Sequence, residues 1–223
     1  MFACRDFVAG DLILRDHVAL EVSKRFESDE VDPVEIHKAF EQAPSHIQQQ
    51  VLQLTHTSNP EDIDRLWDSF SDLKSASELE RAISAASKFA NNCFGDGHKQ
   101  WLAIDVSRIN HSCRFNACVK RDEDKLTVRA IKSIAKGEEI TIAYFSVACS
   151  ISERRERLKA WNIVCGCEDC TSTTEESRDR NTKRSRLGEV LGGLAEEKTA
   201  GGYEEALKLT EGIPEFVGYR ADL

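Results

Sequence analysis

Residues 108–116 read RINHSCRFN, and residues 137–144 read GEEITIAY. The first stretch is polar and brings an asparagine, a histidine and a cysteine together between two apolar runs. The second opens with a turn at Gly137 and continues as an apolar run, which predicts a strand over 139–145. The polar side chains of the first stretch are therefore expected in a loop between strands.

A third stretch, residues 165–170, reads CGCEDC and holds three of the eight cysteines of the chain. Intracellular proteins keep thiols reduced, so clustered cysteines indicate a metal rather than disulfides. Tetrahedral zinc needs four ligands, so a fourth must come from elsewhere in the chain, which offers five other cysteines. The pattern is also compatible with thiols that pack on a loop without a metal.

A helical block lies upstream of these stretches. Apolar residues recur at helical spacing from Asp32 to about residue 88, with Pro33 in a first turn, a second helix from Asn59-Pro60 and a third from about Ser77. Short β-like runs precede and follow the block. The sequence therefore predicts an α+β fold of short strands and small sheets with a helical insertion at about 32–90.

The flanking segments carry turn and helix signals. Residues 2–22 predict a β-hairpin that turns at Gly10, and Asp122-Glu123-Asp124 predicts a hairpin loop. Residues 151–161 predict a short helix. We expect an exposed linker over 172–186, which is polar and mixed in charge.

The last segment, residues 187–223, is expected to be a short helical extension. Its two predicted helices, 187–197 and 203–211, are separated by Gly201-Gly202 and are too short to hold a core alone.

Composition limits the classes of protein that the chain can belong to. Of its 223 residues, 40% are hydrophobic and 31% are charged, as in folded globular proteins. No apolar run approaches a membrane span and no secretory signal opens the chain, so an intracellular protein without a membrane partner is expected. The formal charge of −9 argues against direct binding of nucleic acid and suits a basic protein tail better.

The three quoted stretches, in this order, resemble the SET domain. That family pairs N-H-S-C-x-P-N with G-E-E-I/L-T-x-x-Y and a post-SET C-x-C-x-x-C. Phe2-Ala3 and residues 6–11 look like its first hairpin, and Asn92-Cys93-Phe94 is similar to its N-x-F segment. The resemblance covers about residues 2–170.

The helical insertion and the C-x-C-x-x-C form are similar to the SET-and-MYND branch and its fungal relatives. The MYND zinc finger itself is missing from the sequence. The insertion has no cysteine before Cys93, and we interpret its histidines His37, His46 and His56 as solvated or packed.

The resemblance implies a domain organisation and a set of site residues. A SET domain would span 1–150, followed by a post-SET zinc segment at 151–171. Structural Zn²⁺ would be bound by Cys113, Cys165, Cys167 and Cys170. S-adenosylmethionine would contact Asn110 and His111 of the signature loop (residues 108–116), with Asn92 as a further cofactor residue. The hydroxyl of Tyr144 would lie near the transferring methyl group.

Plainer interpretations of two of these residues remain open. His111 also fits a buried histidine that organises the loop without touching the cofactor, and a tyrosine that ends a strand is ordinarily part of a core.

The function implied is transfer of a methyl group from S-adenosylmethionine to a lysine of a histone or another protein, in the nucleus or the cytoplasm. The alternative is a non-catalytic SET-fold interaction module. Two departures from the family motivate it: the G-x-G expected before Phe2-Ala3 is missing, through truncation or loss, and Phe115 replaces a proline.

Overall fold

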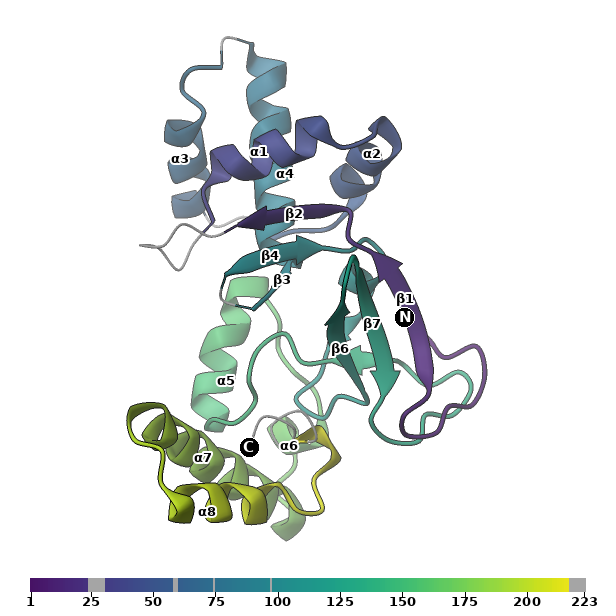
Figure 1. Cartoon of the computed structure of the whole chain (residues 1–223), viewed down its shortest axis with the longest axis vertical. Coiled ribbons are helices and arrows are strands. Elements are labelled where there is room, and N and C mark those ends of the chain that lie inside the picture. Colours follow the sequence, from purple (N-terminus) through teal and green to yellow (C-terminus); the bar gives the residue numbers. More distant parts are fainter. Residues whose placement is uncertain (24–30, 58–59, 74, 97, 217–223) are drawn as a thin grey trace. The chain divides into compact units, whose positions relative to one another are not determined.

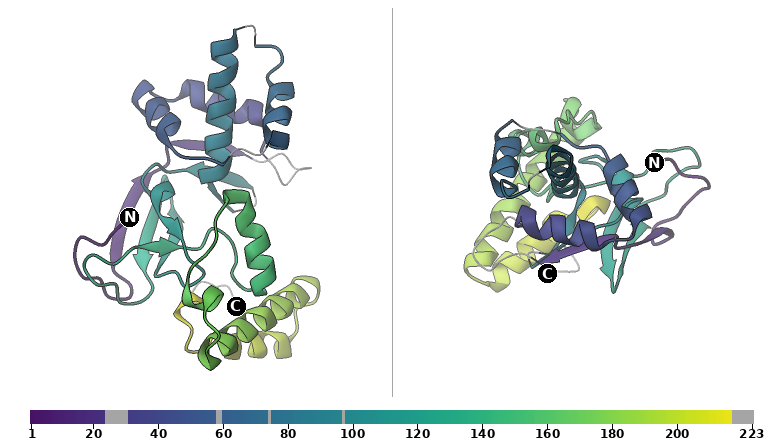
Figure 2. Two further views of the ribbon diagram at one scale, coloured as in Figure 1. Left: turned by 180° about the vertical axis from the view of Figure 1, so that it is seen from behind. Right: turned by 90° about the horizontal axis from the view of Figure 1, so that it is seen from above.

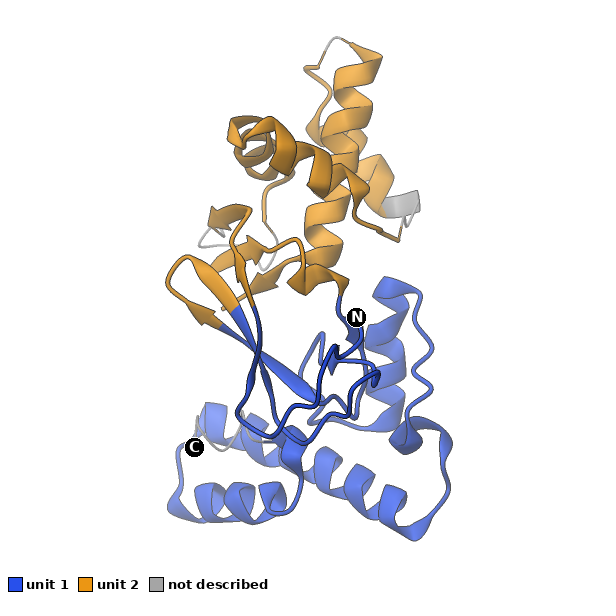
Figure 3. Ribbon diagram, turned by 90° about the vertical axis from the view of Figure 1, so that its right-hand side faces the viewer, with its two compact units in different colours: residues 1–14, 109–120, 127–223 blue, residues 15–108, 121–126 orange. Residues whose placement is uncertain are grey.

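The computed structural model is an α+β arrangement of small sheets and helices (Figure 1), which confirms the predicted fold class. It describes residues 1–23, 31–57, 60–73, 75–96 and 98–216. The chain divides into two compact units, which Figure 3 colours separately. Unit 1 comprises residues 1–14, 109–120 and 127–223, and unit 2 comprises residues 15–108 and 121–126. The domain boundaries expected at residues 150 and 171 stay a prediction.

Unit 2 contains the predicted helical insertion. Its helices are α1 (Pro33–Gln42), α2 (Ser45–Gln53), α3 (Pro60–Ser69) and α4 (Ala76–Asn92). Asp32 caps α1 by accepting a hydrogen bond from the backbone N–H of Val34, and Ser75 caps α4 in the same way. The first predicted helical section divides in two because Pro44 follows the end of α1.

The core of unit 2 is apolar. The helix α4 buries Ala82, Ala85, Ala86 and Phe89 along one face, and α1, α2 and α3 all contact this helix (Figures 1 and 2). Phe40 of α1 and Val51 of α2 are also fully buried in this cluster. Of the apolar residues whose spacing predicted the helices, Phe40, Val51 and Phe89 are buried here, whereas Trp67 is exposed.

A three-stranded antiparallel sheet completes unit 2. Its strands are β2 (Leu20–Ser23), β4 (Lys99–Leu102) and β3 (Phe94–Gly95), in the order β2-β4-β3. Leu20 pairs with Leu102, and both side chains are buried in the same cluster as the helices.

A second three-stranded sheet has strands with residues in both units. Its order is β1-β7-β6, formed by β1 (Leu12–His17), β7 (Lys125–Ala130) and β6 (Ala117–Asp122). The predicted loop between β6 and β7 is confirmed, with Glu123 in a left-handed conformation at φ 52°.

The predicted N-terminal hairpin is wrong in its pairing. The turn at Gly10 is present, with φ 94°, but β1 pairs with β7 and not with the residues before the turn. Phe2 and Phe7 instead form isolated bridges with Glu139 and Ile134. A turn signal fixes where the chain reverses, while the strand partner is chosen by long-range packing.

The two quoted stretches 108–116 and 137–144 meet in a short parallel pair of strands. Strand β5 (Asn110–His111) follows the 3₁₀ turn η1 (Val106–Arg108) and lies beside β8 (Thr141–Ile142). Asn110 pairs with Thr141, and His111 pairs with Ile142. This pairing positions the signature loop against the strand that leads to Tyr144.

The predicted short helix over 151–161 is confirmed. It consists of α5 (Ile151–Leu158) and the 3₁₀ turn η2 (Lys159–Trp161). Ser150 and Glu153 form a capping box at its start. The short helix α6 (Glu168–Thr171) then carries the end of the cysteine stretch.

The linker expected over 172–186 is wrong for most of its length, because residues from 175 onward belong to a long helix. Helix α7 (Glu175–Glu196) is capped by Thr174, and it buries Ser177 and Arg184 within the stretch that looks solvated in sequence. Because polar residues occupy these buried positions, the stretch shows no apolar periodicity, and the sequence does not predict this helix.

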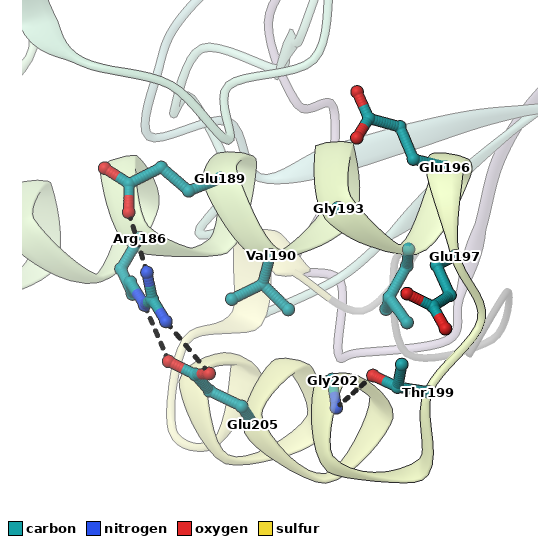
Figure 4. A pocket seen from close by; sticks show the side chains of 10 residues that line it. Arg186, Glu189, Val190, Gly193, Glu196, Glu197, Thr199, Gly202 and Glu205 are labelled. Carbon is teal, nitrogen blue, oxygen red and sulfur yellow. Dashed lines mark hydrogen bonds and ion pairs between the residues drawn. The ribbon is translucent and has the colours of Figure 1, made fainter.

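Helix α8 (Ala200–Thr210) begins at Ala200, so Gly201-Gly202 lies in its first turn and does not separate the two helices. The turn η3 (Pro214–Phe216) follows. Figure 4 shows the hollow between α7 and α8, where Arg186 forms ion pairs with Glu189 and Glu205.

Within the described residues, no helix combines the length and the apolar character needed to cross a membrane.

Candidate functional site

The four cysteines predicted as metal ligands come together in unit 1. Cys113 lies just after β5. Cys165 and Cys167 lie in the loop before the short helix α6, and Cys170 lies within that helix. The four sulfur atoms lie within 4.8 Å of one another, and the Sγ atoms of Cys113 and Cys170 are 3.6 Å apart. Among the described residues, no other group of histidine, cysteine or carboxylate side chains gathers in this way.

The donor set fits a tetrahedral metal. A zinc–thiolate bond of about 2.3 Å in tetrahedral geometry separates the sulfurs by about 3.8 Å, which these thiols can reach with small adjustments. Hydrogen bonding with Cys113 lowers the pKa of Cys165 and, to about 6, that of Cys167, whereas hydrogen bonding with Cys165 raises the pKa of Cys113. The close approach of the four sulfur atoms is what allows the group to hold a metal ion.

Asn110 sits at the start of β5 with an exposed side chain. Its amide Nδ2 donates a hydrogen bond to Oε1 of Glu139 at 2.7 Å. The amide is therefore held in a defined orientation by a residue of the second quoted stretch.

His111 connects the metal-ligand group to the strand after it. Its Nδ1 accepts a hydrogen bond from the backbone N–H of Tyr144 at 3.2 Å, and its Nε2 lies 3.4 Å from Sγ of Cys113. Both ring nitrogens are engaged within the protein. For the side chain, this geometry favours the interpretation in which His111 organises the loop.

Tyr144 is half-buried, and its hydroxyl donates a hydrogen bond to the carbonyl oxygen of Ile109 at 2.8 Å. Burial, with a contribution from the charge of Glu139, raises the pKa of Tyr144 above its ordinary value. The hydroxyl therefore stays protonated at physiological pH.

Two further aromatic side chains, Phe145 and Trp161, lie beside Tyr144 and His111. The ring of Tyr144 lies 5.4 Å from His111 and 5.5 Å from Trp161, while Phe145 stacks on His111 at 5.2 Å. We call His111, Tyr144, Phe145 and Trp161 the aromatic cluster. The sequence motifs do not include Phe145 and Trp161, although a tryptophan at the end of the charged helix 151–161 is a signal that points to the second of them.

Asn92 lies at the end of α4 in unit 2. Its Nδ2 donates hydrogen bonds to the carbonyl oxygens of Thr55 and Lys88, both at 2.8 Å. These bonds fix the end of the helix, and the cofactor role of Asn92 stays a prediction.

Phe115 stands where the SET domain has a proline, and its side chain is buried. Only 8% of it is exposed, and it belongs to a cluster that includes Val190 of α7 and Phe216. The signature loop therefore gains an apolar anchor at the position of the replaced proline.

Comparison with known proteins identifies the family to which this chain belongs. Residues 1–145 match the SET domain, and the chain belongs to the SET-domain family. It is 36% identical over 74 residues to the N-lysine methyltransferase SMYD2-B of Danio rerio, a match covering 32% of this chain and 17% of that protein.

Two further relatives extend the similarity. The histone-lysine N-methyltransferase SET5 of Scheffersomyces stipitis is 30% identical over 129 residues, covering 53% of this chain and 26% of that protein. The histone-lysine N-methyltransferase ASHR1 of Arabidopsis thaliana is 34% identical over 102 residues, covering 43% and 21%. The match thus spans about a quarter or less of these relatives. They confirm the resemblance to the SET-and-MYND branch and its fungal relatives.

Proposed function

We propose that the chain is an S-adenosylmethionine-dependent protein-lysine methyltransferase that modifies a histone or another protein. The β5–β8 pair carries the proposal, because it holds Asn110 and His111 beside β8, which ends two residues before Tyr144. The printed names of the three relatives support it, since each is called a lysine methyltransferase.

S-adenosylmethionine would supply an electrophilic methyl group on a sulfonium. Asn110 and His111 are the residues of unit 1 that would hold it, and the cofactor role of Asn92 stays a prediction. In-line attack by a neutral amine depends mainly on alignment. The hydroxyl proton of Tyr144 is committed to Ile109, so its oxygen lone pairs would accept a hydrogen bond from the incoming amine.

The aromatic cluster would act on the charge of the substrate lysine. Apolar surroundings disfavour the ammonium form, and they exclude water from the reacting amine. The rings of Tyr144, Phe145 and Trp161 lie within 6.3 Å of a neighbouring ring in this cluster, which provides such a surface. Their proposed role is to help the amine lose its proton before attack.

The four-cysteine group is proposed to bind one Zn²⁺ through Cys113, Cys165, Cys167 and Cys170. Four thiolates fill a tetrahedral site and leave no open position for substrate, so the metal would be structural. Its role would be to tie the residues after α5 to the signature loop.

A lysine-rich protein tail is the acceptor that suits the formal charge of −9. Free clustered cysteines fit the reducing nucleus or cytoplasm, and a histone acceptor would place the reaction in the nucleus.

A non-catalytic SET-fold interaction module is the second candidate. The observation in its favour is that the amide of Asn110 and both ring nitrogens of His111 already have partners within the protein. A cofactor that used these atoms would have to displace existing contacts.

Calorimetry with S-adenosylmethionine and transfer of a labelled methyl group to mixed histones would test the proposal on the zinc-loaded chain. Tyr144→Phe should bind the cofactor normally and lose transfer by about 100-fold, because the amine loses its alignment. Tyr203→Phe on α8 is the matched control and should transfer normally. A chain that binds no cofactor would instead support the interaction module.

A further inference from the structure

Two fully buried charged side chains lie next to the four cysteines. Arg184 comes from α7, and Asp169 stands between Cys167 and Cys170; both side chains have no exposed surface. Nη2 of Arg184 donates to Oδ2 of Asp169 at 3.0 Å, and Nη1 donates to the carbonyl oxygen of Cys113 at 2.6 Å. One guanidinium therefore joins the two halves of the ligand set, which are far apart in sequence.

Three other residues of α7 contact the same turn. Nε of Arg180 donates to Oδ1 of Asp169 at 2.7 Å, and Nδ2 of Asn181 donates to its backbone carbonyl at 2.8 Å. Ser177 Oγ donates to the carbonyl oxygen of Glu168 at 3.3 Å. Positions 177, 180, 181 and 184 share one helical face, so α7 presents a continuous polar face to the cysteine turn.

Apolar side chains lie beside this polar face. Leu187 and Val190, on the next turn of α7, belong to the buried cluster that contains Cys113 and Cys170. The ring of Phe216 lies 5.6 Å from the guanidinium carbon. Burial of an ion pair gives little net stability, because desolvation offsets the attraction, so stability alone does not explain this pair.

The charge around the cysteines matches a four-thiolate metal site. Zn²⁺ with four thiolates carries a net charge of 2−. The charged side chains that belong to the turn or bond directly to it carry an excess of two positive charges; they are Arg114, Arg155, Arg180, Arg184, Glu168 and Asp169. Their excess offsets the charge of the loaded site.

We propose that Arg184 is a positioning residue of the metal site, and that helix α7 sets metal affinity by holding Cys113 against the Cys167–Cys170 turn. The inference rests on the proposed zinc site. It makes α7 part of that site although none of its residues is a ligand.

A purely structural role for Arg184 has a different signature. Such a role would lower the free energy of unfolding by the same amount with and without zinc. A positioning role lowers the additional stability that zinc provides, because that addition depends on the affinity of the folded state for the metal.

The test compares Arg184→Met and Arg184→Lys with Arg178→Met, a control on the same helix whose side chain is exposed. Zinc affinity is measured on the full chain by competition with a chromophoric chelator, and unfolding in urea is followed with and without zinc. Arg184→Met should weaken zinc binding by about 10- to 100-fold, as loss of an outer contact to a metal ligand does.

Arg184→Lys should lose less affinity than Arg184→Met, because its ammonium can still donate to one acceptor although it lacks the planar fork that reaches both. The control should bind zinc as the wild type does. Unchanged zinc affinity in a folded Arg184→Met variant overturns the inference. If that variant does not fold, affinity of Arg184→Lys equal to that of the control overturns it. If the wild-type chain binds no zinc, the proposed zinc site is itself wrong, and the inference about Arg184 is wrong with it.

Discussion

The helical insertion and the cysteine region are held together in opposite ways. In the insertion, the fully buried side chains are apolar, among them Phe40, Val51 and Phe89. Around the cysteines, the fully buried set includes Arg154, Arg184 and Asp169. Apolar burial is non-directional and scales with area, whereas a buried charge is stable only while its partners stay in place.

The two regions are therefore sensitive to different kinds of substitution. The insertion should lose stability in steps that follow the volume removed, and it should keep its architecture. The cysteine region should behave as one unit, because loss of one partner leaves others buried without hydrogen bonds.

The largest expected effect comes from Cys167→Ser, which removes a thiolate from the centre of the ligand set. Structural zinc binding contributes on the order of 10 kcal/mol in small cysteine sites. We expect the variant to lose about one zinc per chain, measured by elemental analysis, and to unfold at lower temperature. Cys4→Ser, at an exposed cysteine, is the control. Full metal content in the Cys167 variant would refute the ligand assignment.

Phe89→Ala would test the helical insertion, which is held together by apolar burial. Phe89 is fully buried on α4, so its removal leaves a cavity and should cost about 3–5 kcal/mol of the free energy of unfolding. Urea denaturation gives this number. The zinc affinity of the folded variant should equal that of the wild type. A clear fall in affinity would show that the two regions are not independent.

Two glycines of α7 provide a sharper contrast within one helix. An added Cβ at Gly188 would overlap the carbonyl oxygen of Ala148, whereas one at Gly192 meets no atom. Gly188→Ala should therefore destabilise the protein by about 1–3 kcal/mol and weaken zinc binding, because α7 must shift. Gly192→Ala should stabilise it by up to about 1 kcal/mol. Equal effects would mean that α7 does not pack closely here.

The smallest effect is expected at the sheet of unit 2. Glu21 accepts hydrogen bonds from Lys99 and Trp101, and the bond from Lys99 lowers the pKa of Glu21 below its ordinary value. Because the pair is partly exposed, Glu21→Gln should cost less than about 1 kcal/mol. A lowered pKa stabilises the fold above the ordinary value of about 4.3.

The difference between Glu21→Gln and the wild type should therefore disappear as the pH falls through the lowered pKa of Glu21. Denaturation curves at several pH values would measure it. A difference that grows in acid would contradict this assignment.

The helical insertion and the cysteine region also differ in how well the sequence predicts their structure. The helices of the insertion were predictable because apolar spacing both forms them and packs them. The four cysteines were predictable from their spacing together with the resemblance. Helix α7 was not, since Arg184 in a charged stretch looks solvated, and only the fold shows that it is buried.

Strand partners were also beyond the sequence. The N-terminal segment carries a clear turn at Gly10, yet β1 pairs with β7, more than a hundred residues away. The aromatic cluster is a similar case. Phe145 and Trp161 belong to different local patterns, and only the chain path brings their rings to 6.3 Å.

The bond between Arg184 and the carbonyl of Cys113 spans 71 residues, and this separation has a consequence for the order of assembly. Contacts between distant residues form slowly, and during synthesis the signature loop leaves the ribosome long before α7 exists. Until α7 docks, the thiol of Cys113 is open to oxidants and to competing metals. Docking of α7 therefore ends the period during synthesis and folding in which Cys113 can react.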